Sequence, residues 1–486
     1  MAMTDTAPDQ SPEKNWFGHP RGLTFLFGTE MWERFSYYGN RVLLPIYLTG
    51  YLLLPGHSEH VVGYETLKHF FESFRGPLGI QPLQSMIYAT YTALVYFTPL
   101  IGGFLADRFF GRRSTVIVGG LFMAAGQFLM TSDNLFFVAM MFMIVGNGAF
   151  KPNISTQVGG LYKPGDHRID RAYSIFYVGI NVGSLLGQII CGFLGEKVAW
   201  HYGFAAAGVG MLIGTVVYMF ALRTLPRDTA GRQAKAATVA APPRKPFMRD
   251  DWIAVAILIL LFIPSILFWA TYEQSGNVIE IWSRDYLDRT VNLGFASFEI
   301  PVTMLQNVNP FFIFTFTPLI LMFWKRQQDR KREPSVVTKL ALGCLLIAIS
   351  YFLLAGVQHM AGAGKISWAW CVLYFAILTL GELYFSPVGL SLYAKAAPPQ
   401  IAGFMMAVFL ASSSPGNFLA GLLGSYWSGM DKTEFFLMIG SIIGIAAPII
   451  FMFKSPIENI LHKRREQEKL TGSDPMEQPH MEPPPG

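Results

Sequence analysis

Residues 27–53 read FGTEMWERFSYYGNRVLLPIYLTGYLL, a stretch that is long enough to cross a bilayer and yet carries four charged side chains. These are Glu30, Glu33, Arg34 and Arg41. A charge at the bilayer centre costs about 2.5–3.5 kcal/mol even on the most lenient insertion scale. Membrane helices tolerate such residues where they face one another across a water-filled cavity. The stretch therefore indicates a membrane protein with an internal pathway for a solute.

Three more charges follow the same pattern. Lys151, Glu273 and Glu382 also lie in segments that otherwise read as membrane-spanning helices, which makes four acids and three bases in all. If every base is paired, one carboxylate is left over, and a carboxylate can carry a proton. None of the nine histidines is placed at mid-membrane. Carboxylates rather than imidazoles are therefore the predicted proton carriers.

The composition agrees with a membrane protein. The 486 residues are 52% hydrophobic and only 14% charged, whereas a typical soluble domain has about 25% charged residues. The net charge of +5 does not indicate nucleic-acid binding, because its location on one side of the predicted membrane explains it. The three cysteines have no metal-like spacing, and we find no nucleophile elbow or phosphate-binding loop. We expect a protein embedded in lipid that is not an enzyme and that needs no cofactor or metal.

Twelve segments have about the 20 residues that a bilayer requires. The predicted spans are Phe27–Leu53, Ser85–Ala106, Thr115–Met130, Phe136–Leu161, Tyr173–Leu194, Tyr202–Leu222, Trp252–Gly276, Val302–Trp324, Val337–Val357, Trp368–Ala396, Ile401–Trp427 and Phe435–Phe453. With both termini in the cytoplasm, 26 of the 37 Lys and Arg residues fall on the cytoplasmic side and seven in outer loops. That distribution fits the positive-inside rule and predicts a multi-pass protein of the cell membrane.

A polar stretch divides the spans into two sets of six. Residues 223–250 are rich in Ala, Pro, Arg and Lys and have no apolar period, which predicts a cytoplasmic linker. The expected fold is an all-α membrane protein of twelve transmembrane helices in two six-helix bundles, the major facilitator fold. The parts are a cytoplasmic N-terminus (1–21), the two bundles (22–222 and 251–454) and a cytoplasmic tail (455–486).

The first span presents its charges on one side. Glu30 is three residues from Glu33 and four from Arg34, and helical residues at these spacings share a face. The stripe continues one turn on with Tyr37, Tyr38 and Arg41. An ion-pair cluster that only holds helices together is the structural alternative, but ionisable residues at membrane depth are usually functional.

Three further charged positions have a helix-breaking context. In GAFKPN (148–153), Gly and Pro are expected to loosen the helix around Lys151, whose alternative role is a fixed ion pair between helices. In GELYFSP (381–387), Glu382 and Ser386 precede a proline that predicts a broken, mobile, cavity-lining helix. Asp107 begins the turn after the second span, where it could cap the next helix or pair with a base across a cytoplasmic gate.

Neutral polar groups complete the predicted site. They are Tyr96, Asn181 and the run QNVNP (306–310), which includes Asn309. Hydrogen bonding between helices explains these residues equally well. A cavity lined by both signs of charge together with Tyr and Asn suits a zwitterionic ligand, because bases would hold its carboxylate and acids its ammonium group.

These residues resemble the proton-dependent oligopeptide transporter family of the major facilitator superfamily. Glu30–Gly39 is similar to the first-helix motif of that family, Gly103–Gly111 to its loop signature and Tyr173–Leu185 to its fifth-helix signature. The likeness extends through Phe268–Gln274, Gln306–Pro310 and Glu382–Pro387.

The resemblance implies a proton-coupled symporter that imports di- and tripeptides by alternating access. It implies that Glu30, Glu33, Arg34 and Glu273 couple protons. Arg41 would pair with Glu273 in closing the outer side, and Lys151 would pair with Glu382. The substrate-binding residues implied by the resemblance are Arg41, Tyr37, Tyr38, Tyr96, Lys151, Asn181, Asn309, Glu382 and Ser386.

The chain departs from its relatives at two positions in these helices. Many relatives have a histidine in the second helix where Ala89 stands, which excludes a histidine-based proton step at that position. Relatives often have a tryptophan in the eleventh helix where Phe409 keeps the aromatic face but lacks the indole donor. The main alternative function is a carrier of another small solute, such as nitrate or a peptide-like drug, and competition with dialanine would separate the two.

Overall fold

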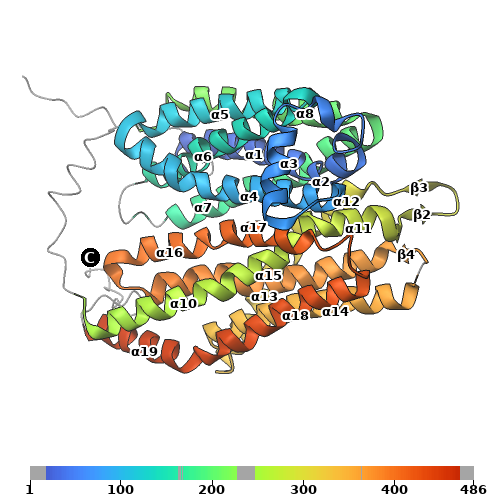
Figure 1. Ribbon diagram of the computed structural model, residues 1–486. Helices are drawn as coiled ribbons and strands as arrows, with labels where there is room; N and C mark the ends of the chain where they lie inside the picture. Colours follow the sequence, from blue (N-terminus) through green and yellow to red (C-terminus); the bar gives the residue numbers. More distant parts are fainter. Residues whose placement is uncertain (1–17, 163–165, 167, 227–246, 363, 471–486) are drawn as a thin grey trace, which may run out of the picture.

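The computed structural model describes residues 18–162, 166, 168–226, 247–362 and 364–470 (Figure 1). We call its parts before and after residues 227–246 the first half and the second half. Within the described residues, ten helical segments are long and apolar enough to cross a membrane. Two further long helices are α1, with 21 residues, and α5, with 18.

The first half consists of helices. They are α1 (Arg21–Arg41), α2 (Leu44–Tyr47), η1 (Leu48–Leu52), η2 (Ser58–His60), α3 (Tyr64–Arg75), α4 (Ile80–Leu105), η3 (Ala106–Phe110), α5 (Arg112–Leu129), η4 (Asp133–Leu135), α6 (Phe136–Gly160), α7 (Ile169–Phe193), η5 (Leu194–Val198) and α8 (Trp200–Ala221).

The second half adds four short strands to its helices. Its elements are α10 (Arg249–Tyr272), η6 (Glu273–Gly276), α11 (Val278–Tyr286), β1 (Leu287–Asp288), β2 (Thr290–Asn292), β3 (Ser297–Glu299), α12 (Val302–Leu305), α13 (Val308–Asp329), α14 (Val336–Ala361), β4 (Ile366–Ser367), α15 (Trp368–Ala396), η7 (Pro399–Ile401), α16 (Ala402–Ala411), α17 (Ser413–Gly424), α18 (Lys432–Met452) and α19 (Lys454–Leu470). β2 and β3 form an antiparallel hairpin, and β1 pairs with β4 in parallel. We call the end of the molecule that carries these strands the hairpin end.

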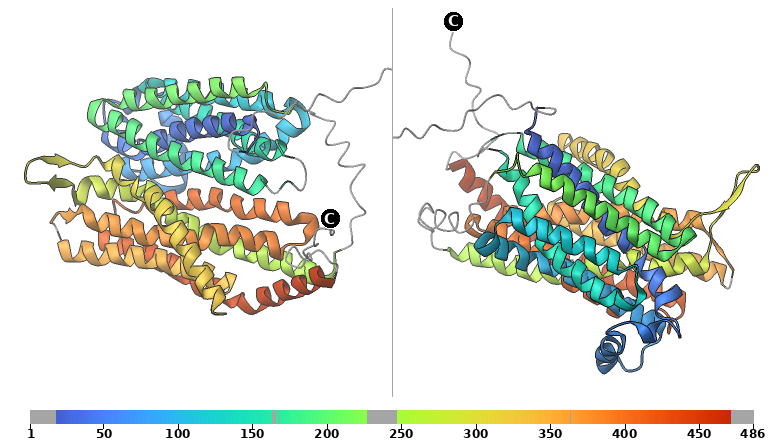
Figure 2. Two further views of the ribbon diagram at one scale, coloured as in Figure 1. Left: turned by 180° about the vertical axis from the view of Figure 1, so that it is seen from behind. Right: turned by 90° about the horizontal axis from the view of Figure 1, so that it is seen from above.

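The buried apolar side chains form two separate cores. One lies between Leu23 and Leu225 in the sequence and the other between Ile257 and Ile457. In Figure 1 the first half forms the upper layer and the second half the lower one, and α4 packs against α17 where they meet. The left view in Figure 2 shows the same two layers from behind, and in the right view, from above, the first half lies over the second. A cavity between the layers can therefore draw residues from both halves.

Large apolar side chains are exposed along the outward faces of the long helices. On α8, for example, Val209, Val216 and Phe220 are about half exposed. Soluble monomers rarely expose contiguous apolar surfaces of this extent, and a lipid environment explains them. The exposed faces and the ten apolar helices make this a multi-pass membrane protein.

A close helix contact fixes the position of the charged first helix. α1 packs along α7, and a Cβ atom added at Gly183 would lie 2.0 Å from the carbonyl oxygen of Met31. Only glycine allows backbones to approach this closely, as in other membrane helix pairs. Glu30, Glu33 and Arg34 of α1 are thereby held in the interior of the first half.

Every predicted span overlaps a helix, but several boundaries were wrong. The first helix begins at Arg21 rather than Phe27 and ends at Arg41, and the chain continues through the short helices α2 and η1. The segment predicted to end at Gly276 continues as α11 to Tyr286. Part of the predicted tail is the helix α19, and residues 1–17, 227–246 and 471–486 lie outside the described residues.

Candidate functional site

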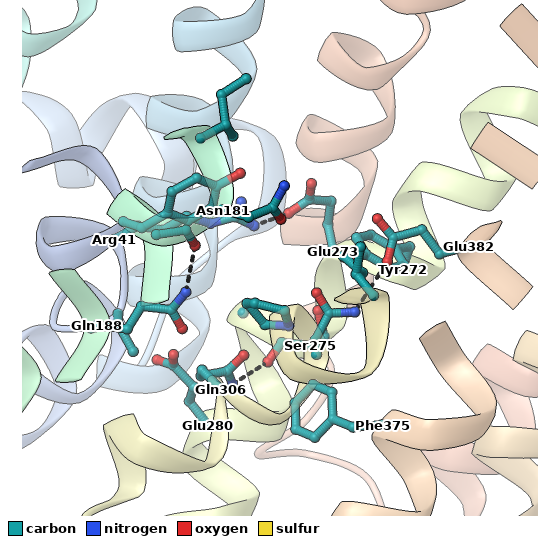
Figure 3. A pocket seen from close by; sticks show the side chains of 18 of the residues that line it. Arg41, Asn181, Gln188, Tyr272, Glu273, Ser275, Glu280, Gln306, Phe375 and Glu382 are labelled. Atoms are coloured by element: carbon teal, nitrogen blue, oxygen red, sulfur yellow. Dashed lines mark hydrogen bonds and ion pairs between the residues drawn. The ribbon is translucent and has the colours of Figure 1, made fainter. Parts of the chain in front are cut away.

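A cavity of about 250 Å³ lies between the two halves (Figure 3). That volume is near the lower end of the range for small-molecule sites, roughly 300–1,000 Å³. The polar and aromatic residues that line it are Tyr38, Arg41, Tyr96, Tyr177, Asn181, Ser184, Gln188, Trp269, Tyr272, Glu273, Ser275, Glu280, Gln306, Asn309, Phe375 and Glu382. Both halves contribute, so a relative movement of the halves would reshape the cavity.

Arg41 and Glu273 join the halves across this cavity. Arg41 is in the last turn of α1, Glu273 begins η6, and their side chains form an ion pair, as the sequence analysis expected. Arg41 Nε also donates a hydrogen bond of 2.8 Å to the hydroxyl of Tyr88. Both charged side chains are largely buried, so breaking the pair would leave two unpaired charges in a poorly solvated place.

Glu30, Glu33 and Arg34, which also lie on α1, form a cluster inside the first half. Arg34 Nε lies 3.3 Å from Glu30 Oε1 and also forms an ion pair with Glu33. All three side chains are almost fully buried. The second oxygens, Glu30 Oε2 and Glu33 Oε1, have no hydrogen-bond partner among the described residues. Two carboxylates thus share one guanidinium group.

Lys151 belongs to this cluster rather than to the second half. The charged groups that act on it electrostatically are Arg34, Glu33, Glu30 and Arg41, and its ammonium group lies 4.9 Å from the centre of the Tyr96 ring. The pair with Glu382 is not among the ion pairs of the described residues. The helix α6 also continues through Pro152 without a break, because proline in a membrane helix is tolerated where neighbouring groups satisfy the backbone.

Glu382 is held by neutral groups of the second half. Asn309 Nδ2 donates to Glu382 Oε2 at 3.0 Å and to Thr379 Oγ1 at 2.9 Å. The predicted break at Pro387 was wrong, since α15 is continuous from Trp368 to Ala396. The helices of the second half are interrupted just before Asn309, because α12 ends at Leu305 and α13 begins at Val308.

Many polar contacts between the halves gather at the hairpin end. Gln84 and Ser85 of α4 donate to Asn277 Oδ1 at 3.1 and 3.2 Å. Arg75 of α3 donates to Tyr426 and Ser425 at 2.7 and 2.6 Å. These hydrogen bonds therefore hold the two halves together on this side of the cavity.

Glu196 makes a further contact of this kind. Its carboxylate, in η5 of the first half, accepts hydrogen bonds from Val302 N at 2.9 Å and Thr303 N at 3.1 Å. These are the first two residues of α12 in the second half. Glu196 Oε1 also lies 3.6 Å from Arg289, which in turn pairs with Glu299 at 2.6 Å.

Asp107 does not bridge the halves. It lies in η3, the extension of α4, and accepts a hydrogen bond of 2.8 Å from Arg112 Nε at the start of α5. The carboxylate is more than half exposed. The expected helix cap is also missing, because no side chain caps α5.

The structure divides the predicted site residues into two groups. Those that line the cavity are Tyr38, Arg41, Tyr96, Asn181, Glu273, Asn309 and Glu382. Those that are not among its lining residues are Glu30, Glu33, Arg34, Tyr37, Asp107, Lys151 and Ser386. Tyr37 is buried, with the guanidinium of Arg34 5.2 Å from its ring. Phe409 is also buried, 5.0 Å from Tyr393 between ring centres, so it does not offer an aromatic face to the cavity.

Several polar residues of the cavity were not predicted as site residues, among them Glu280 and Gln188. Glu280 was placed in an outer loop because the seventh span was predicted to end at Gly276, but α11 brings it to the cavity wall. Gln188 follows Asn181 by seven residues, two turns along the same face of α7, and that spacing could have identified it. Within the described chain, no three His, Cys, Asp or Glu side chains are grouped as a metal site needs.

Comparisons with known proteins point to one family. Residues 113–240 and 229–438 match the sequence profile of the POT family (PTR2). The chain is 33% identical to a di-/tripeptide transporter of Lactococcus lactis subsp. lactis (strain IL1403), over 92% of this chain and 98% of that protein. It is 29% identical to the peptide transporter YePEPT of Yersinia enterocolitica subsp. palearctica serotype O:3 (strain YE-P4), over 94% and 98%. The crystal structure of a POT family transporter in complex with 5-aminolevulinic acid superposes with a TM-score of 0.77 at 30% identity, over 92% of this chain and 98% of that chain.

Proposed function

Because the chain belongs to the POT family, we propose that it is a proton-coupled symporter that imports di- and tripeptides by alternating access. The observation that carries the proposal is the buried ion pair of Arg41 and Glu273, which joins the two halves across a cavity of small-molecule size. The named peptide transporters among its relatives, similar over nearly the whole chain, support the substrate class. The chain acts without chemistry on its substrate and without a cofactor, with protons as the coupling ion.

The proposed architecture has twelve transmembrane helices in two bundles of six. The ten apolar segments together with α1 and α5 make twelve helices, which supports that number. Six of these helices belong to the bundle of residues 22–222 and six to the bundle of residues 251–454. Residues 1–21, 223–250 and 455–486 then lie in the cytoplasm, as the distribution of Lys and Arg favours. In the cell membrane, the hairpin end faces outward in this arrangement. The contacts between the halves therefore close the cavity on its outer side.

The proton would bind to the acids that face the bases. Glu30 and Glu33 share the guanidinium of Arg34, so one proton between the two carboxylates leaves a single buried ion pair. Protonation of Glu273 would release Arg41, because the ion pair is lost when the carboxylate becomes neutral. The outer closure then loosens, and the halves can rock about the cavity.

The peptide would bind by its two ends. The released guanidinium of Arg41 binds the peptide carboxylate, Lys151 attracts it from behind the cavity wall, and Glu382 takes the ammonium group. Neutral residues would orient the backbone; these are Tyr38, Tyr96, Asn181 and Asn309, with Tyr37 and Ser386 in supporting positions outside the cavity wall. Asp107 would act at the cytoplasmic gate through its contact with Arg112.

The test is uptake of labelled dialanine into proteoliposomes with and without an inward proton gradient. We expect accumulation that collapses with an uncoupler. Glu33→Gln should abolish gradient-driven uptake and retain counterflow exchange, because binding and rocking survive while the coupling carboxylate is gone. Glu65→Gln, a change in an exposed residue of α3, is the matched control and should behave as the wild type. Failure of the folded wild type to take up dialanine would refute the substrate assignment and direct attention to nitrate and peptide-like drugs.

A further inference from the structure

Glu280 is a buried carboxylate that the proposed transport cycle does not use. It lies on α11, its side chain lines the cavity between the halves, and its exposed fraction is 2%. Its Oε2 atom has no hydrogen-bond partner among the described residues. Leaving a buried charged oxygen unsatisfied is costly unless a ligand or an ion supplies what the protein does not.

Within the described chain, no base of the cavity wall is left to pair with Glu280. Among the residues that line the cavity, Arg41 is the only base, and it already forms the ion pair with Glu273. The charged groups near enough to act on Glu280 are Arg41 and the carboxylate of Glu196, which carries the same sign as Glu280. Glu382, the third acid of the cavity wall, is held by Asn309. The cavity therefore holds three carboxylates against one guanidinium.

The neutral neighbours in the cavity also favour a cation. Gln188 uses its amide N–H to donate to Ser184 Oγ at 2.9 Å, and Gln306 uses its own to donate to the carbonyl oxygen of Ser275 at 2.7 Å. Each amide keeps its carbonyl oxygen and one N–H for a ligand, and both residues line the cavity with Glu280, whose carboxylate needs a donor (Figure 3). Carboxylate and amide oxygens are acceptors, and a Lys ammonium or Arg guanidinium offers only donors.

We infer that Glu280, with the amide oxygens of Gln188 and Gln306, forms a subsite for the cationic side chain of a transported peptide. The inference rests on the proposed function and goes beyond it, because it assigns a preference for basic peptides. The ends of the peptide bind to Arg41 and Glu382, and the basic side chain is directed toward α11. An apolar side chain of similar length, such as that of methionine, gains nothing from Glu280, since it has no donor to offer.

Binding to the purified full-length protein tests the inference independently of transport. Isothermal titration would compare alanyl-lysine, alanyl-methionine and dialanine for the wild type, for Glu280→Gln and for Glu65→Gln. Glu65 is an exposed carboxylate of α3, so its variant is the matched control for a lost negative charge. We expect Glu280→Gln to weaken alanyl-lysine binding about tenfold or more, as for a lost hydrogen bond to a charged group. Dialanine and alanyl-methionine should change less than about twofold.

The other outcomes of the titration separate a failure of the subsite from a failure of the proposed function. Retained dialanine binding shows that the Glu280→Gln protein is folded, and an unchanged preference for alanyl-lysine in that protein overturns the subsite alone. An equal loss for all three peptides also overturns it and indicates a general role for Glu280 in the site. If the folded wild type binds none of the three peptides, the proposed function fails and the subsite fails with it.

Discussion

Glu196 provides a measure of how strongly the hairpin end is closed. Its carboxylate accepts hydrogen bonds from Val302 N, Thr303 N and Thr303 Oγ1 at 2.9, 3.1 and 3.2 Å, and these bonds join the two halves. A hydrogen bond to a charged group contributes about 1.5–3 kcal/mol net. The three bonds share one carboxylate that is partly reached by water, so their contributions do not add, and we take the loss in Glu196→Ala as about 2 kcal/mol.

This loss acts on the closed form alone. When the hairpin end opens, water satisfies the carboxylate and the two backbone N–H groups in the wild type as well. The substitution therefore shifts the balance between closed and open forms rather than destabilising both. Since 1.4 kcal/mol corresponds to a factor of ten, about 2 kcal/mol predicts a roughly 30-fold larger open population.

Labelling of a cysteine at Ser85 would report this population. Ser85 is buried, and its hydroxyl lies 3.2 Å from Asn277 across the boundary between the halves. A membrane-impermeant maleimide should reach Ser85→Cys only while the hairpin end is open. While the open form is the minor one, Glu196→Ala should raise the labelling rate by about 30-fold. The same protein with serine at position 85 corrects for the three native cysteines, which are buried.

The matched control is Asp431→Ala. Asp431 caps α18 through hydrogen bonds from Thr433 N at 2.9 Å and Glu434 N at 3.3 Å, and all of these residues belong to the second half. It is a helix-capping carboxylate like Glu196, but it joins no second-half element to the first half. The proposed role of Glu196 in closing the hairpin end is refuted if Glu196→Ala leaves the labelling rate unchanged, or if Asp431→Ala raises the labelling rate to the same extent.

Two further predictions concern packing and substrate binding. Gly183→Ala should lower the free energy of unfolding by about 1–3 kcal/mol or prevent folding, because its Cβ would overlap α1. Gly356→Ala is the control and should be neutral or stabilising, because a Cβ there meets nothing within 4 Å. Thermal unfolding in detergent measures both variants, and equal stability of the two would contradict the prediction for Gly183. Asn309→Ala should raise the KM for dialanine about tenfold, because Glu382 loses a hydrogen bond of 3.0 Å, and Asn292→Ala in the exposed hairpin should leave the KM unchanged.

The sequence was sufficient to predict the helices and the charges of the first span. A 20-residue apolar run can form little else in a bilayer, so each of the twelve predicted spans overlaps a helix. The spacing of Glu30, Glu33 and Arg34 determined that they share a face, and the structure joins them in ion pairs. Local sequence periodicity was enough to predict both the helices and the charged face of the first span, because the interactions concerned lie within one helix.

Contacts between distant residues could not be obtained in this way. The pairing of Arg41 with Glu273 followed from family resemblance, since 232 residues separate the two and no local pattern connects them. The helix break predicted at Pro387 was wrong, because whether a membrane helix breaks at a proline depends on neighbouring groups that satisfy the backbone. Glu280 was missed because a hydropathy boundary cannot tell a loop from a short amphipathic helix that returns to the cavity.

The position of the buried charges suggests why transport and closure would be coupled. In the first half, Arg34 and Lys151 balance Glu30 and Glu33. At the boundary between the halves, Arg41 stands against Glu273, Glu280 and Glu382. An empty cavity that is closed at the hairpin end therefore encloses more negative than positive groups, and a low dielectric makes that excess costly. Protons or the cationic groups of a peptide remove the excess. We therefore expect the loaded protein to close and reopen more readily than the empty one, so that exchange of peptide should be faster than net transport.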